Sequence, residues 1–237
     1  MGVWRQVRPH PNLFWRSVVV MKLINHPAAQ SVLDELHSAA SDDKLRWTER
    51  SEGAGGDNAR GGGDLVRLGE FYLAVSAEEG AFLYVLARAI NAKRIVEFGA
   101  SFGVSSIYLA AAAKDNGGTL ITTEVHPEKC AALREIFDRA QLSDAVTLLE
   151  GDARETLKGV TEPVDLLFLD GWKSAYLPVF NLMRPRLKPG AIVLADNIHH
   201  EAAADYLALV SSDESGCMTV IRDDLAISYV NSDGSAG

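Results

Sequence analysis

Two short stretches of this chain place charged side chains where a buried strand is expected to end. The first is "DGWKSAY", which follows the apolar run "VDLLFL", and the second is "DN", which follows "GAIVLA". Carboxylate and amide oxygens can bind a hard cation, a lysine amine can accept a proton, and an indole ring can cover a ligand. Taken singly, such residues also serve as helix caps, turn residues, solvated charges or packing residues. The candidates are Asp170, Trp172, Lys173, Asp196 and Asn197.

The stretch "EFGASFGVSS" shows a second feature, because it spans the end of another short apolar run, at 94–99. Gly99 and Gly103 allow a tight turn and a close approach of a ligand to the backbone. The helix that follows presents free N–H groups, which favour an anionic group such as a carboxylate, and Ser101 and Ser105 add hydroxyls. Glycines also join strands to helices in many proteins that bind no ligand there.

Two further acidic residues end strand-like runs. Glu124 is placed to accept hydrogen bonds from two ribose hydroxyls, or it is only a carboxylate at the start of the helix that Pro127 opens. Asp152 could accept a bond from an adenine amino group, or it could cap the helix at 153–158. We include Ala153, the next residue, in the same candidate binding site.

The order of elements predicts the architecture that would bring these residues together. Ser76 and Glu79 form a capping box that begins a helix. Strand and helix patterns then alternate, which predicts a doubly wound α/β fold, with a mostly parallel seven-stranded sheet, helices on both faces and an antiparallel C-terminal hairpin. Ligands of such sheets bind beyond the carboxyl ends of the strands. Strand patterns lie at 94–99, 119–124, 145–151, 164–170 and 190–197, helical patterns at 104–114, 127–141, 153–159, 176–187 and 201–212, and the hairpin at 217–230.

The strand ends offer donors for a carboxylate, acceptors for a ribose and an acceptor for adenine. A nicotinamide dinucleotide or S-adenosylmethionine would each suit such a pocket. The dinucleotide fingerprint Gly-x-Gly-x-x-Gly is not met, because Gly99 is followed by Ser101 and Val104 at the other two positions. The predicted antiparallel last strand also favours a methyltransferase over a dinucleotide-dependent oxidoreductase.

Composition excludes some classes of partner. The net charge is −9 and no Lys/Arg-rich run occurs, which argues against a general nucleic-acid binder. No apolar stretch approaches the roughly 20 residues of a membrane-spanning helix. The two cysteines, Cys130 and Cys217, are far apart and have no metal-ligand spacing, as is typical of a reducing compartment. We expect a cytoplasmic protein that acts on a small molecule.

From about Ser76 to the C-terminus the chain resembles the class I S-adenosylmethionine-dependent O-methyltransferases, most of all the cation-dependent catechol and caffeoyl-coenzyme A group. "VEFGASFGVSSIYLA" is similar to the first motif of that family. "DGWKSAY" together with "ADN" at 195–197 is the more specific part of the resemblance. Members carry an aspartate followed three positions later by a lysine, and an Asp-Asn pair at the end of the next strand.

The resemblance implies a role for each of these residues. Asp170, Asp196 and Asn197 would hold a divalent cation, which we expect to be magnesium, and Asp170 would also border the cofactor. Lys173 would be the general base. The residues expected to line the S-adenosylmethionine site are Val75, Gly99, Ser101, Gly103, Ser105, Glu124, Asp152, Ala153 and Trp172, with Trp172 against the adenine.

The physical chemistry of the predicted metal residues agrees with that assignment. Two carboxylates and an amide oxygen at neighbouring strand ends suit a hard cation and do not suit structural zinc. A cation that binds two vicinal oxygens would stabilise a deprotonated phenol and fix its geometry. The predicted acceptor is therefore a catechol-like or other vicinally hydroxylated aromatic molecule. Asp223 and Asp224 lie roughly where some members carry an acidic residue for the second hydroxyl, but their alignment is uncertain.

Three alternatives remain open from the sequence: a metal-independent small-molecule methyltransferase, an NAD-binding oxidoreductase, and a catalytically silent binding protein. The metal residues argue against a silent binder, which would have no use for them. We expect three parts in the chain: an N-terminal extension at 1–21, a helical segment with a glycine-rich flexible loop at 22–68, and a methyltransferase domain at 69–237. A homodimer is a further expectation, because Trp4, Phe14 and Trp15 would otherwise expose apolar surface.

Overall fold

The computed structural model describes residues 22–23, 25–43 and 69–231. The predicted N-terminal extension at 1–21 and the predicted glycine-rich loop at 51–64 lie outside these residues. The prediction of a homodimer rests on Trp4, Phe14 and Trp15, which also lie outside them.

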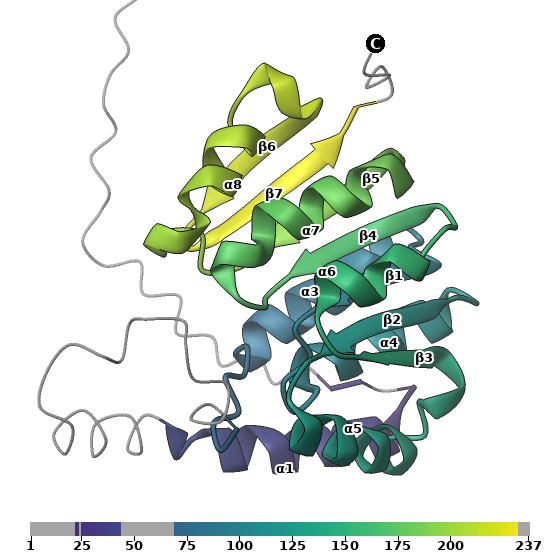
Figure 1. The fold of residues 1–237 in the computed structure, drawn as a ribbon. Helices are drawn as coiled ribbons and strands as arrows, with labels where there is room; N and C mark the ends of the chain where they lie inside the picture. Colours follow the sequence, from purple (N-terminus) through teal and green to yellow (C-terminus); the bar gives the residue numbers. More distant parts are fainter. Residues whose placement is uncertain (1–21, 24, 44–68, 232–237) are drawn as a thin grey trace, which may run out of the picture.

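A seven-stranded sheet in the order β3-β2-β1-β4-β5-β7-β6 forms the centre of the molecule (Figure 1). The first five strands in the chain are parallel, and β7 runs antiparallel to both β5 and β6. The predicted doubly wound sheet with an antiparallel C-terminal hairpin is therefore confirmed. The strands are β1 (Arg94–Phe98), β2 (Thr119–Glu124), β3 (Val146–Glu150), β4 (Val164–Leu169), β5 (Leu187–Ala195), β6 (Cys217–Arg222) and β7 (Leu225–Val230).

Helices cover both faces of the sheet. Those on the near face of Figure 1 are α6 (Ala153–Thr156), α7 (Tyr176–Met183) and α8 (Ala204–Val210). The other face carries α1 (Pro27–Ala40), α3 (Ala77–Ala89), α4 (Val104–Asp115) and α5 (Pro127–Arg139). Within the described parts of the chain, no helix is both long enough and apolar enough to cross a membrane.

Each face of the sheet has its own apolar core. On the α4 side, Ile95, Leu120 and Leu166 pack with α4, whose residues from Val104 to Ala113 are all buried. The four consecutive alanines of α4 explain that burial, because small side chains let a helix lie close to the sheet and its neighbours. The opposite core gathers Val96, Leu167 and Val193 under α7 and α8.

Two elements differ from the sequence prediction. The strand β5 begins at Leu187, whereas the pattern predicts a start at 190. The helix predicted over 176–187 is α-helical only to Met183, and a 3-10 turn at Arg184–Arg186 completes it. Pro185 explains the end of α7, because proline has no N–H to donate to a helical hydrogen bond. The strand β5 begins earlier because Leu187 already pairs with Val164 of β4.

A carboxylate at the end of α4 ties two other helices to it. Asp115 accepts hydrogen bonds from the Tyr84 hydroxyl of α3 at 2.6 Å and from His26 Nε2, just before α1, at 3.0 Å. Burial alone would raise the pKa of Asp115, but the bonds from Tyr84 and His26 outweigh it and hold that pKa below its usual value. The ionised Asp115 therefore stabilises the packing of α1 and α3 on α4.

Asp115→Ala should lower the free energy of unfolding at pH 7 by about 1–3 kcal/mol, because it leaves two polar partners unpaired. Urea denaturation measures the difference from wild type. Since the folded pKa of Asp115 is depressed, its contribution is present above the unfolded pKa and is lost as the pH falls through the folded value. The difference should therefore shrink in acid. The matched control is Asp138→Ala, at an exposed position of α5, which should stay within about 0.5 kcal/mol of wild type.

Candidate active site

The loop after β1 is shaped by two glycines. Gly99 has a φ of 99°, and a Cβ there would lie 2.7 Å from the backbone N of Gly171 in the loop after β4. Gly103 has a φ of 83° at the start of α4, where a Cβ would lie 2.8 Å from Leu133. Both residues must therefore be glycine, and the backbones after β1 and β4 approach each other closely. This matches the turn that the sequence predicts at this point.

Glu124 ends β2 with its carboxylate already oriented. Oε2 accepts a hydrogen bond from the backbone N–H of Ser101 at 2.8 Å. Oε1 accepts bonds from the backbone N–H groups of Val125 at 2.9 Å and His126 at 2.8 Å. These bonds fix the carboxylate at the carboxyl edge of the sheet and leave one lone pair, on Oε2, that can accept a ligand hydroxyl.

A buried acid in β1 is a functional candidate that sequence reasoning missed. Glu97 is fully buried, and its carboxylate accepts hydrogen bonds from the hydroxyls of Ser105 at 2.6 Å, Ser106 at 2.5 Å and Thr122 at 2.6 Å. The predicted ligand contact Ser105 therefore directs its hydroxyl at Glu97, and only 5% of the residue is exposed. An acidic residue inside the apolar strand "RIVEF" was the signal that could have found it.

Asp152 caps the short helix α6, as one of its two predicted roles requires. Its Oδ1 accepts a bond from the backbone N–H of Arg154 at 2.9 Å, and its carboxylate also pairs with the Arg154 guanidinium. That guanidinium, through its hydrogen bond, holds the pKa of Asp152 below its usual value. Ala153 is buried beside it in the apolar core under α7, and its predicted role toward the cofactor stays a prediction. The role of Asp152 toward adenine stays a prediction.

Asp170 and Lys173 lie together in the loop after β4. The Lys173 ammonium is 3.1 Å from Oδ1 of Asp170 and donates a hydrogen bond to the hydroxyl of Tyr176 at 2.9 Å. That hydroxyl donates in turn to the backbone carbonyl of Asp196 at 2.9 Å. Burial raises the pKa of Asp170 to about 7, Lys173 opposes that shift, and the charge of Asp196 adds to it.

The register of β4 and β5 brings the second predicted pair to the same place. Leu169 pairs with Ala195, and the backbone N–H of Asp196 donates to the Leu169 carbonyl at 3.0 Å. Asn197 follows in a left-handed conformation with a φ of 51°, and its side-chain amide contacts Oδ2 of Asp196 at 3.2 Å. Burial raises the pKa of Asp196, and the charges of Glu79 and Asp224 raise it further.

The two aspartates do not by themselves make a closed metal site. Across the described residues, no group of three or more His, Cys, Asp or Glu side chains is arranged to hold an ion. Asp170, Asp196 and the Asn197 amide oxygen could supply three oxygens to a hard cation, whose other ligands would be water or substrate. The pKa values of both aspartates are raised chiefly by burial and further by neighbouring acids, and a bound cation would oppose both shifts.

Apolar side chains border these polar groups. Trp172 is 37% exposed between β4 and α7, although it is a large aromatic residue. Val75 is buried just before the capping box of α3, and Leu73 is 46% exposed in a left-handed conformation with a φ of 48°. A partly open aromatic and an exposed leucine are suited to cover a flat or apolar ligand.

The turn between β6 and β7 also reaches the site, through Asp224. Its Oδ1 accepts a bond from the backbone N–H of His199 at 3.0 Å, and its carbonyl accepts from that of Ile198 at 3.1 Å. Asp223 is almost fully exposed and contributes its carbonyl to the His199 ring at 3.0 Å. Of these two neighbouring acids, Asp224 is therefore the one whose charge acts on Asp196.

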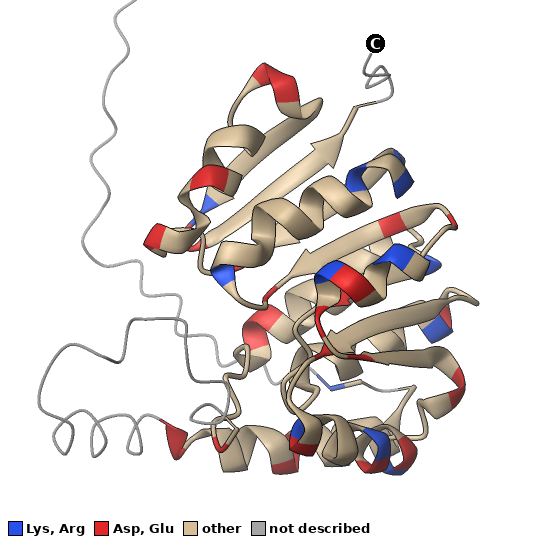
Figure 2. Ribbon diagram, viewed as in Figure 1, with Lys and Arg blue, Asp and Glu red and all other residues tan. Residues whose placement is uncertain are grey.

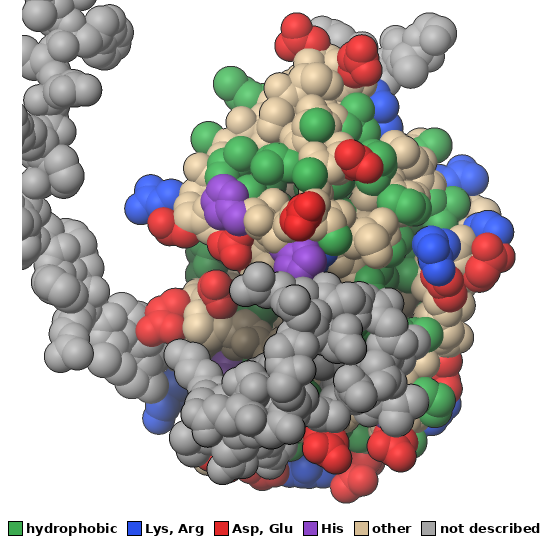
Figure 3. Space-filling model, turned by 60° about the vertical axis from the view of Figure 1, so that its left-hand side comes forward, with side chains coloured by type: hydrophobic (Ala, Val, Ile, Leu, Met, Phe, Trp, Pro, Cys, Tyr) green, Lys and Arg blue, Asp and Glu red, His purple; other side chains and the backbone are tan. Residues whose placement is uncertain are grey.

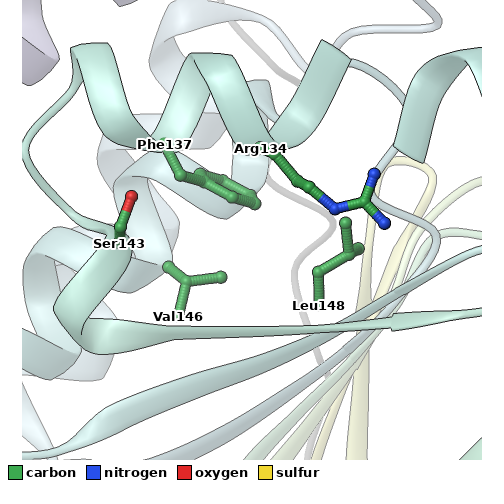
Figure 4. A pocket seen from close by; sticks show the side chains of 5 residues that line it. All are labelled: Arg134, Phe137, Ser143, Val146 and Leu148. Carbon is green, nitrogen blue, oxygen red and sulfur yellow. The ribbon is translucent and has the colours of Figure 1, made fainter. Parts of the chain in front are cut away.

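The acidic character of this edge is visible in the figures. Figure 2 shows Asp and Glu residues at the carboxyl ends of the parallel strands and at the start of α3. Figure 3 turns that side toward the reader and shows acidic and histidine side chains among hydrophobic ones. A hollow of about 230 Å³ lies elsewhere, between α5 and β3, and is lined by Arg134, Phe137, Ser143, Val146 and Leu148 (Figure 4). None of the predicted site residues lines it, so it is not part of this site.

Comparison with known proteins agrees with this geometry. A family model described as "Methyltransferase domain" matches residues 96–198. Catechol O-methyltransferase of Niastella koreensis is 35% identical over 56% of this chain, and that of Mycobacterium tuberculosis is 35% identical over 53%. These two alignments span 62% and 57% of the relatives' own length. Catechol O-methyltransferase B of Danio rerio is 28% identical over 86% of this chain and 77% of its own.

Solved structures show the same fold. An O-methyltransferase from Bacillus cereus in complex with S-adenosylhomocysteine (SAH) superposes with a TM-score of 0.65, at 20% identity, over 90% of this chain and 94% of that one. A cofactor-bound protein from MTB superposes with a TM-score of 0.60, at 27% identity, over 68% of this chain and 83% of that one.

The strand order and these superpositions define a class I methyltransferase fold. The resemblance that the motifs indicate is confirmed by the relatives. By sequence and fold, the chain is similar to S-adenosylmethionine-dependent O-methyltransferases, with catechol O-methyltransferases among its relatives.

The buried Glu97 generates a prediction about stability and pH. Burial raises the pKa of Glu97, three hydroxyl bonds oppose the shift, and the charge of Glu124 adds to it. A raised folded pKa means that its contribution to stability is fully present below the unfolded pKa and is lost as the pH rises through the folded value. Urea denaturation of wild type and Glu97→Gln should be compared over a pH series. The free energy of unfolding of wild type should fall relative to that of the variant as the pH rises. A wild-type advantage that grew with pH would contradict this sign.

Proposed function

We propose that this chain transfers the methyl group of S-adenosylmethionine to a hydroxyl of a small, vicinally hydroxylated aromatic molecule, assisted by a divalent cation, magnesium. One observation carries the proposal. Two partly buried carboxylates, Asp170 and Asp196, follow the ends of neighbouring strands, with the lysine nitrogen 3.1 Å from the first of them. They stand beside a pre-oriented acid, Glu124, on the same edge of the sheet.

The cofactor half of the proposal uses β1 and β2. Glu124 would accept bonds from the ribose hydroxyls, because three backbone N–H groups already hold its carboxylate in place. The loop from Gly99 to Gly103 and the first turn of α4 would receive the carboxylate of the methionine part. Trp172 is exposed enough to lie against the adenine. The cofactor-bound relatives support this half of the proposal.

The metal half uses β4 and β5. Asp170, Asp196 and Asn197 would hold the cation through oxygen atoms, which is the chemistry that magnesium prefers. When bound, the cation would lower the pKa of an acceptor hydroxyl, which is near 10 for a free phenol. The residues fit the ion, since each aspartate has a pKa raised by burial and by neighbouring negative charge.

Once its ammonium has released a proton to solvent, Lys173 would accept the proton of the acceptor hydroxyl as a neutral amine. Its nitrogen is held by Asp170 on one side and by the Tyr176 oxygen on the other. Tyr176 is completely buried and donates its own proton to the Asp196 carbonyl, so its oxygen presents a lone pair to Lys173. The arrangement orients the amine beside the proposed cation, where the reacting hydroxyl would lie.

An aromatic acceptor is supported by the surroundings of these polar groups. Leu73 and Trp172 present exposed apolar surface, and Asp224 adds a carboxylate near Asp196. The relatives named catechol O-methyltransferases act on a diphenol by their names. We therefore infer a catechol-like acceptor for this chain.

A methyl-transfer assay tests the metal half. Wild type, Asp196→Asn and the surface control Asp138→Ala should be assayed with S-adenosylmethionine and a panel of catechols, with Mg²⁺ and with excess EDTA. We expect turnover only with Mg²⁺, a loss of about 100-fold or more in Asp196→Asn, and wild-type rates in the control. Turnover that ignores both EDTA and the Asp196 substitution would favour a metal-independent methyltransferase on the same fold.

A second variant tests the proposed base. Lys173→Met should lower kcat by about 10²–10⁴-fold, since the proton of the acceptor would lose its recipient. Binding of SAH, measured by calorimetry, should remain within about threefold of wild type. The control is Lys188→Met, on the surface at the amino end of β5. A variant with wild-type kcat would show that another group takes the proton.

A further inference from the structure

Lys129 is a buried lysine in an unfavourable position. It lies in the first turn of α5, where the partial positive charge of the helix N-terminus disfavours a cation. Only 4% of the residue is exposed, and burial lowers its pKa, although Glu124 and Asp43 raise it. Lysine is almost never fully buried without a partner. Lys129 is therefore unfavourable both because it is buried and because it lies at a helix N-terminus. A residue that is unfavourable in two ways indicates a role beyond stability.

The ammonium of Lys129 joins two segments that are far apart in the sequence. It donates hydrogen bonds to the backbone carbonyl of Phe71 at 2.9 Å and to the hydroxyl of Ser101 at 2.9 Å. It also lies 5.2 Å from the ring centroid of Phe102. Phe71 belongs to the segment before α3, and Ser101 belongs to the loop after β1, which carries the proposed cofactor contacts.

The segment of residues 71–75, here called the wall segment, is held from several sides. The Ser101 hydroxyl donates to the Tyr72 carbonyl at 2.6 Å, and the rings of Tyr72 and Phe102 lie with centroids 4.6 Å apart. On the other side, Oδ2 of Asp43 accepts bonds from the backbone N–H groups of Tyr72 at 2.8 Å and Leu73 at 3.0 Å. These contacts hold Leu73 in its left-handed conformation.

The same contacts reach the proposed ribose acid. Ser101 is itself left-handed, with a φ of 49°, and its backbone N–H donates to Glu124. Lys129 therefore fixes the side chain of a residue whose backbone orients Glu124. The charge of Glu124 in turn favours the Lys129 ammonium. The wall segment, the loop after β1 and Glu124 are thus coupled through one buried cation.

We propose that Lys129 is a positioning residue of the cofactor site, whose ammonium holds the wall segment and the Ser101 loop in the binding arrangement before the cofactor arrives. The inference rests on the proposed function, since it assumes that these loops bind S-adenosylmethionine. Removing the ammonium leaves the wall segment free to sample other conformations. Part of the binding free energy is then used to restore the arrangement. The apparent affinity equals the intrinsic affinity multiplied by the fraction of molecules that already have the binding arrangement.

Calorimetric titration with SAH tests the proposal on the full-length protein. The variant Lys129→Met keeps most of the buried apolar length and removes every donor. The matched control is Lys114→Met, because Lys114 also donates to a backbone carbonyl, that of Gln141, and to a side-chain oxygen, that of Asp144. Lys114 lies at the far end of α4, away from the carboxyl edge of the sheet.

We expect Lys129→Met to bind SAH about tenfold or more weakly, which corresponds to a wall arrangement populated about a tenth of the time. The kcat at saturating cofactor should stay within about threefold of wild type, because the bound cofactor restores the arrangement. If Lys129 had only a structural role, Lys129→Met would lower the melting temperature. It would not weaken SAH binding while leaving kcat nearly unchanged. Lys114→Met should bind SAH as wild type does.

Ser101→Gly provides a second variant if Lys129→Met fails to fold. Glycine is compatible with the left-handed backbone at this position, and the change removes the hydroxyl that links Lys129 to Tyr72. It should weaken SAH binding about threefold or more. Wild-type affinity in either folded variant would overturn the positioning role and leave the proposed function intact. Failure of the wild-type protein itself to bind SAH would overturn the proposed function and the inference with it.

Discussion

The parallel pairing of β4 and β5, which brings two partly buried carboxylates to one edge of the sheet, is the constraint on which the proposed site depends. Parallel pairing sets Leu169 beside Ala195, so Asp170 and Asp196 must leave the sheet next to each other. Both have pKa values raised by burial, and each lies in the field of other acids. Lys173 compensates one of them, and Tyr176 fixes Lys173 from below.

The site is divided along the sheet. Groups for the proposed cofactor come from β1 and β2, and groups for the proposed cation come from β4 and β5. The two halves meet between β1 and β4, where the order of strands in the sheet reverses and where open α/β sheets bind their ligands. The backbones of Gly99 and Gly171 lie so close together there that a Cβ on Gly99 would clash with Gly171. Methyl transfer needs such a junction, because donor and acceptor must approach along one line.

Much of this arrangement could be predicted from the sequence, because residues at strand ends need only the strands to be recognised. The positions of Gly99, Glu124, Asp170 and Asp196 followed from apolar runs of the right length. The sequence does not contain the three-dimensional neighbours of a residue, and that is where prediction failed. Glu97 looked like an interruption in a strand, although three hydroxyls from two elements hold it.

Lys129 was missed for a related reason. It reads as an ordinary charged residue at the start of an amphipathic helix, and only the fold brings Phe71 and Ser101 to it. The hydrophobic pattern alone does not resolve the boundary at which α7 ends near Pro185 and β5 begins at Leu187. Asp152 remained ambiguous because a helix cap and a ligand acceptor require the same residue type at the same position.

Left-handed residues other than glycine gather around this edge of the sheet. Leu73, Ser101 and Asn197 all have positive φ angles near 50°, a conformation that costs a side-chain-bearing residue free energy. Replacing them by glycine would relieve that strain while removing the side chains that shape the site. A laboratory selection for heat resistance alone would therefore favour glycine at the exposed Leu73, although not at Ser101, whose hydroxyl holds the buried Lys129 ammonium. The protein would gain thermal stability while it lost side chains that shape the site. Any such selection therefore has to be coupled to a screen for turnover.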